Sequence, residues 1–149
     1  VAHANNRNVS RHLRDRFPHP YTREHGRGFL TWLAQQDLPS VWAIAVDGRA
    51  VGGIGLQPGQ DVERVSAEIG YWLGEAFWGR GIATAALAAV TAPAFAAFGL
   101  ARIFALPFAA NAASIRVLEK AGYVREGHLR RSVIKGGVIQ DQYVYACYR

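Results

Sequence analysis

A glycine turn that joins an expected strand to a long helix is the feature that most constrains the fold. The strand is expected over 65–73, the turn over 74–81 and the helix over 82–98. Glycine lets the backbone fold tightly with its N–H groups pointing inward, and the first four N–H groups of a helix have no partner within it. Because the helix dipole is positive at this end, the turn is predicted to hold an anion such as a pyrophosphate, with Arg80 beside it. A turn that only connects strand to helix is the alternative, since the third glycine of a dinucleotide-binding fingerprint is missing.

The run from Gly81 to Ala101 contains no charged residue and is long enough to span a bilayer. Alanine dominates the run and supplies little apolar transfer free energy, while Thr84, Thr91 and Pro93 interrupt it. The pattern therefore predicts a helix buried inside an α/β domain, and no membrane partner is expected.

Composition predicts one globular domain over residues 1–149. Half of the residues are hydrophobic and 19% are charged, which excludes disordered, collagen-like and coiled-coil chains. Cys147 is the only cysteine, so we expect no internal disulfide and no multi-cysteine zinc site, and the chain suits a reducing cytoplasm. His12, His19 and His25 follow no spacing typical of a metal site, so no metal is expected. The sequence has no methionine and begins with Val1, so we expect its natural start to be missing. It opens without a recognisable signal peptide.

The formal net charge of +6 comes mostly from arginine, since Lys120 and Lys135 are the only lysines. Arginine suits phosphates and carboxylates, which favours an anionic ligand or partner. Arg7, Arg11 and Arg14 follow a helical spacing that a nucleic-acid-binding face would also show. A solvated helix face is the favoured interpretation, because no nucleic-acid motif accompanies the charge.

The other expected elements alternate helices with strands. Before the glycine turn we expect helical structure near the start of 1–20 and a helix over 22–36, which has Phe29, Leu30 and Leu33 on one side. Two strands over 41–46 and 50–56 should follow, joined by an Asp47-Gly48 turn, and then a loop over 57–61. After the long helix we expect a strand over 102–107, a helix over 111–121 closed by Gly122, and an antiparallel group of strands over 123–125, 129–134 and 142–148 that turns at Gly136-Gly137.

A second motif, Asn111-x-x-Ser114, opens the helix that follows the expected strand over 102–107. Asn111 is a good N-cap, which is its structural interpretation. Together with the glycine turn, this order of motifs resembles the GCN5-related N-acetyltransferase (GNAT) family, and more narrowly the branch of bacterial ribosomal-protein N-terminal alanine and serine acetyltransferases. The stretches 15–22, 52–56 and 67–73 also match that branch, so the resemblance covers nearly the whole chain in order.

The resemblance implies a mixed, mainly antiparallel central sheet flanked by helices, and transfer of acetyl from acetyl-CoA to a primary amine by direct attack. It implies that backbone N–H groups near Tyr71, Trp72 and Leu73 pair with the pantetheine arm and polarise the thioester carbonyl. Asn111 would bind the pantetheine arm, and Ser114 would stabilise or protonate the leaving thiolate. The pyrophosphate would be held by the turn and the first helical residues: Trp78, Gly79, Arg80, Gly81, Ile82, Ala83 and Thr84.

On the amine side, Glu68 is the expected general base, because it lies on the central strand beside the thioester. Its alternative role is a structural carboxylate paired with an arginine such as Arg64. Asp141 is a weaker candidate for substrate binding. Phe17 and Tyr21 match positions that line the acceptor cleft in relatives, although core packing explains them nearly as well.

The chain departs from the family pattern at three points. Nothing ahead of Val9 provides the family's first strand, so we expect that strand to be missing and the sheet to open at the hairpin over 41–56. Trp78 stands where the cradle usually has arginine or glutamine. Leu118 stands where many relatives carry a tyrosine that acts as general acid.

These departures leave several alternatives open. A non-catalytic acyl-CoA-binding sensor or scaffold is the first alternative, followed by a dinucleotide-dependent enzyme and a basic nucleic-acid binder. The acceptor is open between a protein N-terminus, a lysine, a polyamine and a drug, and a homodimer is also an open alternative.

Overall fold

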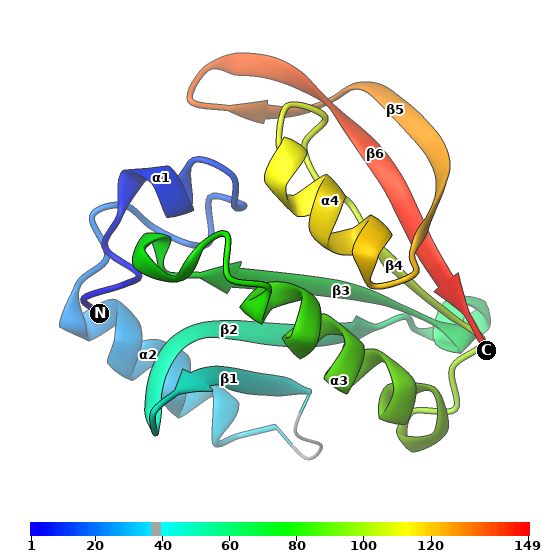
Figure 1. Ribbon diagram of the computed structural model, residues 1–149, viewed down its shortest axis with the longest axis horizontal. Coiled ribbons are helices and arrows are strands. Elements are labelled where there is room, and N and C mark those ends of the chain that lie inside the picture. The colour runs from blue at the N-terminus through cyan, green and yellow to red at the C-terminus, as the bar shows by residue number, and fades with distance from the viewer. Residues whose placement is uncertain (37–39) are drawn as a thin grey trace.

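The computed structural model describes residues 1–36 and 40–149 (Figure 1). The helices are α1 (Arg7–Ser10), α2 (Arg23–Leu33), α3 (Ile82–Ala97) and α4 (Ala112–Lys120), with short 3-10 turns η1 (Asp61–Val65) and η2 (Glu75–Phe77). The strands are β1 (Val41–Val46), β2 (Arg49–Pro58), β3 (Ser66–Leu73), β4 (Arg102–Ala105), β5 (Val124–Lys135) and β6 (Val138–Tyr148).

The six strands form one sheet in the order β1-β2-β3-β4-β6-β5. Every neighbouring pair is antiparallel except β3 and β4, which run parallel. The mixed, mainly antiparallel α/β fold is therefore confirmed. In the described part of the chain, the sheet begins with the β1–β2 hairpin, as the sequence predicts.

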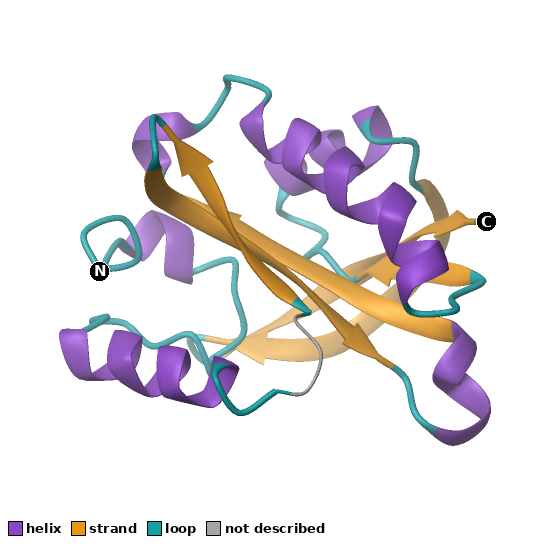
Figure 2. Cartoon of the chain, turned by 90° about the horizontal axis from the view of Figure 1, so that it is seen from below, coloured by secondary structure: helices purple, strands orange, loops and turns teal. Residues whose placement is uncertain are grey.

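The helices lie in two layers on opposite faces of the sheet (Figures 1 and 2). Helices α3 and α4 cover one face, and α1 and α2 lie on the other. The core lies between the sheet and α3–α4, because side chains from both layers are fully buried there. Those with no more than 2% exposure include Ile69, Leu87, Leu100, Ile103 and Leu118.

Helix α3 is the alanine-rich helix that the sequence predicts, but only one face of it is buried, and residues such as Ala88, Ala92 and Ala96 are exposed. It begins after Gly81, contains Pro93 and buries Leu87 and Thr91. The Thr91 hydroxyl donates to the Leu87 carbonyl at 2.7 Å and also contacts the Tyr123 hydroxyl. Among the described residues, no helix is long and apolar enough to cross a membrane.

Several boundaries differ from the sequence-based expectation. Strand β2 continues through Pro58, so the predicted loop over 57–61 is wrong at its first two positions. Strand β5 is continuous from Val124 to Lys135, because shifts of register after Arg125 and after Leu129 absorb the polar residues that suggested separate strands. Strand β6 starts at Val138 and is longer than predicted.

The first residues also form less helix than expected. Helix α1 has a single turn, and α2 ends at Leu33 instead of continuing to Gln36. Helix α2 starts as predicted, since the Thr22 side chain accepts a hydrogen bond from the His25 backbone N–H. Phe29, Leu30 and Trp32 are exposed, with Leu30 64% accessible, and α2 contributes no buried residue.

Candidate active site

The glycine turn has the geometry of an anion cradle. Gly79 and Gly81 have φ of +73° and +75°, a left-handed conformation that side chains with Cβ rarely adopt. Gly81 is the N-cap of α3 and makes no side-chain cap, so the first-turn N–H groups of the helix stay available. Within the described part of the chain, an added Cβ at either glycine meets nothing within 4 Å, which shows open space above the turn.

Trp78 and Arg80 flank this turn in different ways. The Trp78 indole N–H donates to the Leu73 carbonyl at 2.8 Å, so it ties the turn to the end of β3. The Arg80 guanidinium lies 5.6 Å from the centre of the Phe77 ring and is exposed. Trp78 therefore has a structural contact, while Arg80 presents its charge to solvent beside the open N-terminus of α3.

Strands β3 and β4 separate in the middle of the sheet. Their parallel pairing runs only from Ser66–Arg102 to Glu68–Phe104. In Figure 1 the strands start together near the C-terminus and diverge toward the turn that begins α3. Among the described residues, β4 therefore pairs with no part of 69–73, and the β3 edge there can bond an extended ligand.

Successive side chains of β3 point to opposite faces, which places two predicted catalytic residues on different sides of the sheet. Tyr71 packs against the core and reaches α4, where its Oη lies 2.8 Å from Ser114 Oγ. Glu68 and Trp72 face the N-terminal segment, since Glu68 pairs with Arg14 and Trp72 lies 5.3 Å from Phe17 between ring centres. The gap between β3 and β4 thus has a hydroxyl pair on one face and a carboxylate on the other.

Asn111 is the N-cap of α4, and its Oδ1 accepts from the Ser114 backbone N–H at 3.2 Å. This is the structural role that the sequence offered for Asn111, and it leaves the Asn111 side-chain N–H groups as donors. Capping also fixes Ser114 in the first turn of α4. Leu118, one turn further, is fully buried in the core and carries no group that could donate a proton in the gap.

Tyr71 is a functional candidate whose side chain the sequence reasoning did not single out. Its hydroxyl also donates to the Ser114 carbonyl at 3.2 Å. Burial raises the pKa of Tyr71 to about 12, although the Ser114 hydrogen bond acts in the opposite direction. Tyr71 therefore stays neutral at physiological pH and acts as a hydrogen-bond donor.

The arginine that pairs with Glu68 is Arg14, and the suggested Arg64 is wrong. Arg14 Nη2 lies 2.5 Å from Oε1 and 2.7 Å from Oε2 of Glu68. Arg64 instead donates to the Asp61 carbonyl. Because a carboxylate has about four acceptor positions, the Arg14 contacts leave some of them for another donor.

The predicted acceptor residues Phe17 and Tyr21 lie together on the Glu68 face. Their ring centres are 5.0 Å apart, and Phe17 also contacts Trp72. Both residues are partly exposed rather than buried in the core. The structure therefore brings Phe17, Tyr21, Trp72 and Glu68 to one side of the sheet.

Asp141 lies in a separate polar cluster on the β5–β6 hairpin. Its carboxylate accepts from the Arg131 backbone N–H at 2.8 Å and contacts His128 Nε2 at 2.6 Å. The Arg131 hydrogen bond, followed by the His128 contact, lowers the pKa of Asp141. Its backbone carbonyl accepts from the Ala109 N–H, which places Asp141 beside the loop that leads into α4. His128 was not predicted, because its pairing with Asp141 depends on strand register.

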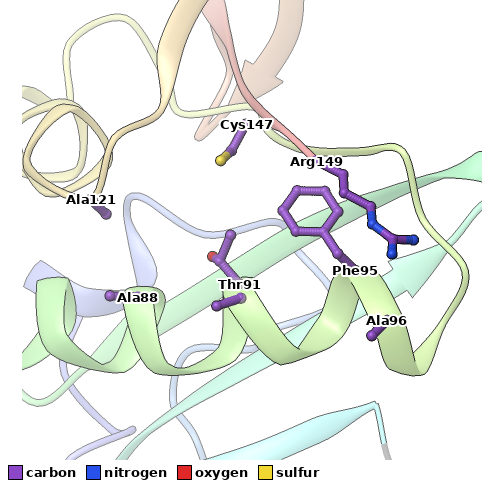
Figure 3. Close-up of a pocket in the computed structure, with 8 residues that line it drawn as sticks. Ala88, Thr91, Phe95, Ala96, Ala121, Cys147 and Arg149 are labelled. Carbon is purple, nitrogen blue, oxygen red and sulfur yellow. The ribbon is translucent and has the colours of Figure 1, made fainter.

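Within residues 1–36 and 40–149, no group of three or more His, Cys, Asp or Glu side chains is arranged to hold a metal ion. Figure 3 shows a cavity of about 530 Å³ between α3 and the end of β6, lined by residues such as Thr91, Phe95, Cys147 and Arg149. It contains none of the predicted site residues.

Comparison with known proteins decides the family. Residues 1–124 match the family model described as an acetyltransferase (GNAT) domain. The chain belongs to the GNAT acetyltransferase family. It is 35% identical over 117 residues to the putative ribosomal N-acetyltransferase YdaF of Bacillus subtilis, an alignment that covers 77% of this chain and 63% of YdaF.

Solved structures of GNAT proteins share the fold. RimJ of Mycobacterium smegmatis, solved with CoA-disulfide, has a TM-score of 0.74 and 32% identity, over 84% of this chain and 61% of RimJ. A GNAT-family acetyltransferase from Bacillus anthracis has a TM-score of 0.81 at 24% identity, over 98% of this chain and 84% of that chain. The resemblance to the branch of ribosomal-protein acetyltransferases is therefore confirmed.

This GNAT chain spans between 45% and 63% of the length of the curated relatives it matches. Acetyl transfer from acetyl-CoA is general for the family. The residues of this chain fit that ligand, because the left-handed glycines leave room for a pyrophosphate at the uncapped end of α3 and Arg80 lies beside it.

Proposed function

We propose that this chain transfers the acetyl group of acetyl-CoA to a primary amine, either a protein N-terminus or a small-molecule amine, by direct attack. The observation that carries the proposal is the gap between β3 and β4. Ser114 lies on the α4 face of this gap and Glu68 on the opposite face, so a thioester in the gap would meet a leaving-group partner and an amine from different sides.

The phosphate end of the ligand would lie on the glycine turn. The backbone N–H groups of Gly79, Gly81 and the residues 82–84 would donate to the pyrophosphate, and Arg80 would add charge. The net charge of +6 favours approach of this polyanionic ligand. Trp78 would hold the turn in place through its bond to Leu73.

The thioester would lie along the open edge of β3. Backbone N–H groups within 71–73 would bond the pantetheine arm and polarise the acetyl carbonyl. An Asn111 side-chain N–H would bond the same arm. Ser114 would donate a hydrogen bond to the departing sulfur. A serine hydroxyl is a much weaker acid than a thiol, so this hydrogen bond stabilises the thiolate without transferring a proton to it.

The amine would approach over Phe17 and Tyr21 and lose its proton to Glu68, directly or through a water. An α-amino group has a pKa of about 8 and a lysine side chain about 10.4, so the base matters more for a lysine. Asp141 would contribute to substrate binding from the β5–β6 hairpin. The similarity to YdaF, a putative ribosomal N-acetyltransferase, favours an amine of a ribosomal component as the acceptor.

A non-catalytic acyl-CoA-binding domain is the second candidate, and one observation favours it. Arg14 already holds both oxygens of Glu68, as a purely structural carboxylate would be held. For either candidate we propose a single domain over 1–149 that acts in the cytoplasm, with no nucleic-acid or membrane partner and no metal. A homodimer stays an open alternative.

Release of free thiol from acetyl-CoA tests the proposed function. The chain is incubated with acetyl-CoA and a panel of N-terminal peptides, blocked lysine peptides, polyamines and aminoglycosides. Thiol release that depends on one class of amine is expected. Binding of acetyl-CoA, but not of NAD or a DNA duplex, without release for any amine would instead support the non-catalytic candidate.

A further inference from the structure

The hydroxyl of Tyr71 connects two elements that are far apart in the sequence. It extends from β3 to the first turn of α4, where it lies 2.8 Å from the Ser114 hydroxyl and 3.2 Å from the Ser114 carbonyl. Tyr71 is partly buried, with its side chain packed against the core. Its hydroxyl therefore has a fixed position beside Ser114.

The pair of hydroxyls has two alternative hydrogen-bond arrangements. In the first, Tyr71 donates to the Ser114 carbonyl and the Ser114 hydroxyl donates to Tyr71, so the serine proton is used within the pair. In the second, Tyr71 donates to Ser114 Oγ, and the serine proton is free to point away from Tyr71. Both arrangements fit the observed oxygen positions.

We propose that Tyr71 is a positioning residue that donates a hydrogen bond to Ser114 Oγ and thereby directs the Ser114 hydroxyl at the sulfur of the leaving thiolate. This inference rests on the proposed function. An anion selects the second arrangement, because a thiolate accepts a hydrogen bond and an uncharged thioester sulfur accepts only weakly. Tyr71 thus strengthens an interaction that forms as charge develops, which lowers the barrier without tightening ground-state binding.

The proton of Tyr71 stays on its own oxygen throughout. Burial raises its pKa to about 12, well above that of an ordinary thiol near 8.5, so proton transfer from the phenol to the thiolate is unfavourable. In the reaction the C–N bond forms and the C–S bond breaks, its electron pair goes to sulfur, and the amine proton goes to Glu68. The thiolate later takes a proton from water.

Tyr71 also accounts for the leucine at position 118. The Leu118 side chain is fully buried under α4 and has no hydroxyl. Tyr71 brings a phenol to the same helix from β3, one turn closer to the start of α4. In this inference, a phenol from β3 that acts through Ser114 takes the place of the phenol that the chain lacks at position 118.

A double-mutant cycle tests the inference on an amine that the wild-type chain acetylates. Tyr71→Phe removes the hydroxyl and keeps the ring, and we expect kcat to fall roughly 10-fold with little change in the KM for acetyl-CoA. In a Ser114→Ala background, Tyr71→Phe should cost almost nothing further, because it acts through that serine. Tyr123→Phe is the control, since Tyr123 is a buried core tyrosine whose hydroxyl contacts the Thr91 hydroxyl at 2.8 Å instead of Ser114.

A second measurement needs no acceptor amine. At about pH 9 much of the free CoA is thiolate, whereas desulfo-CoA has no sulfur. Calorimetric titration should show that wild type prefers CoA over desulfo-CoA, and that Tyr71→Phe and Ser114→Ala reduce this preference several-fold while Tyr123→Phe does not.

The outcomes separate this inference from the proposed function. If no amine is acetylated but the preference for CoA over desulfo-CoA still depends on Tyr71, only the proposed function is contradicted. Full activity of Tyr71→Phe, additive losses in the cycle, or an unchanged CoA preference would overturn the role of Tyr71. A fall in kcat equal to that of Tyr123→Phe, with matching losses of Tm, would show a structural role only.

Discussion

At the scale of single residues, Glu68 has the contact that most needs explanation. Arg14 binds both of its oxygens, yet the Arg14 side chain is 46% exposed and comes from the N-terminal segment. An exposed ion pair contributes only about 0–1 kcal/mol, so an incoming amine can compete with Arg14 for the carboxylate. The Arg14–Glu68 pair is therefore compatible with Glu68 as a base and with Glu68 as a structural carboxylate. Mutation of each member of the pair distinguishes these two roles.

Glu68→Gln and Arg14→Gln remove the same ion pair, but only the first removes the carboxylate. If Glu68 is the base, Glu68→Gln should lose roughly 10²-fold in kcat/KM near pH 7 and recover partly at high pH, where the amine is already neutral. Arg14→Gln should stay within several-fold of wild type. The measurement is the pH–rate profile, corrected for the titration of the amine, with a melting curve for each variant. Equal losses of Tm with full activity in both variants would leave Glu68 a structural role only.

The sequence located residues that belong to local motifs and missed those that depend on distant partners. Asn111 and Ser114 lie in one helical turn, so their spacing predicted the cap that the structure shows. Arg14 and Glu68 are 54 positions apart, and Tyr71 and Ser114 are 43 apart. Contacts over such separations follow from the path of the chain, which local patterns do not determine.

At the scale of secondary-structure elements, turns and caps were predictable and strand lengths were not. Asp47-Gly48 and Gly136-Gly137 turn the hairpins as expected, because these residues have positive φ. The length of β5 depends on its shifts of register against β6, and the polar residues there gave no alternating signal. The packing of α3 against the sheet was predictable from its charge-free run, but the exposure of its outer face, which small alanine side chains allow, was not.

Gly52 on β2 tests how closely the sheet is packed beside the site. An added Cβ at Gly52 would lie 2.4 Å from the Trp72 carbonyl oxygen on β3. Gly52→Ala should therefore lower the free energy of unfolding by about 1–3 kcal/mol. Gly70→Ala on β3 is the control, because nothing described lies within 4 Å of its added Cβ, and it should be neutral or slightly stabilising. Urea denaturation compares the two, and equal stability would contradict the close approach of β2 and β3.

At the scale of the whole molecule, the sheet separates the proposed ligand sites. The glycine turn, α3 and α4 lie on one face, and the N-terminal segment with Arg14 and Phe17 lies on the other (Figure 2). Between these two faces, β3 and β4 pair only over Ser66–Glu68 and Arg102–Phe104, so a ligand in the gap beyond this pairing could contact both faces. The family resemblance implied this architecture, whereas the positions of Tyr71 and Arg14 required the structure.

The central claim is that the turn at the start of α3 holds the pyrophosphate of acetyl-CoA, and calorimetric titration of Gly81→Val tests it most directly. A valine strains the left-handed turn and fills the open space above it, so the Kd should rise at least 10-fold, or about 1.4 kcal/mol. Gly99→Val, at φ +64° beyond the other end of α3, introduces comparable strain away from the turn and should bind like wild type. A Gly81→Val variant that melts like Gly99→Val and binds acetyl-CoA with the wild-type Kd would contradict the account.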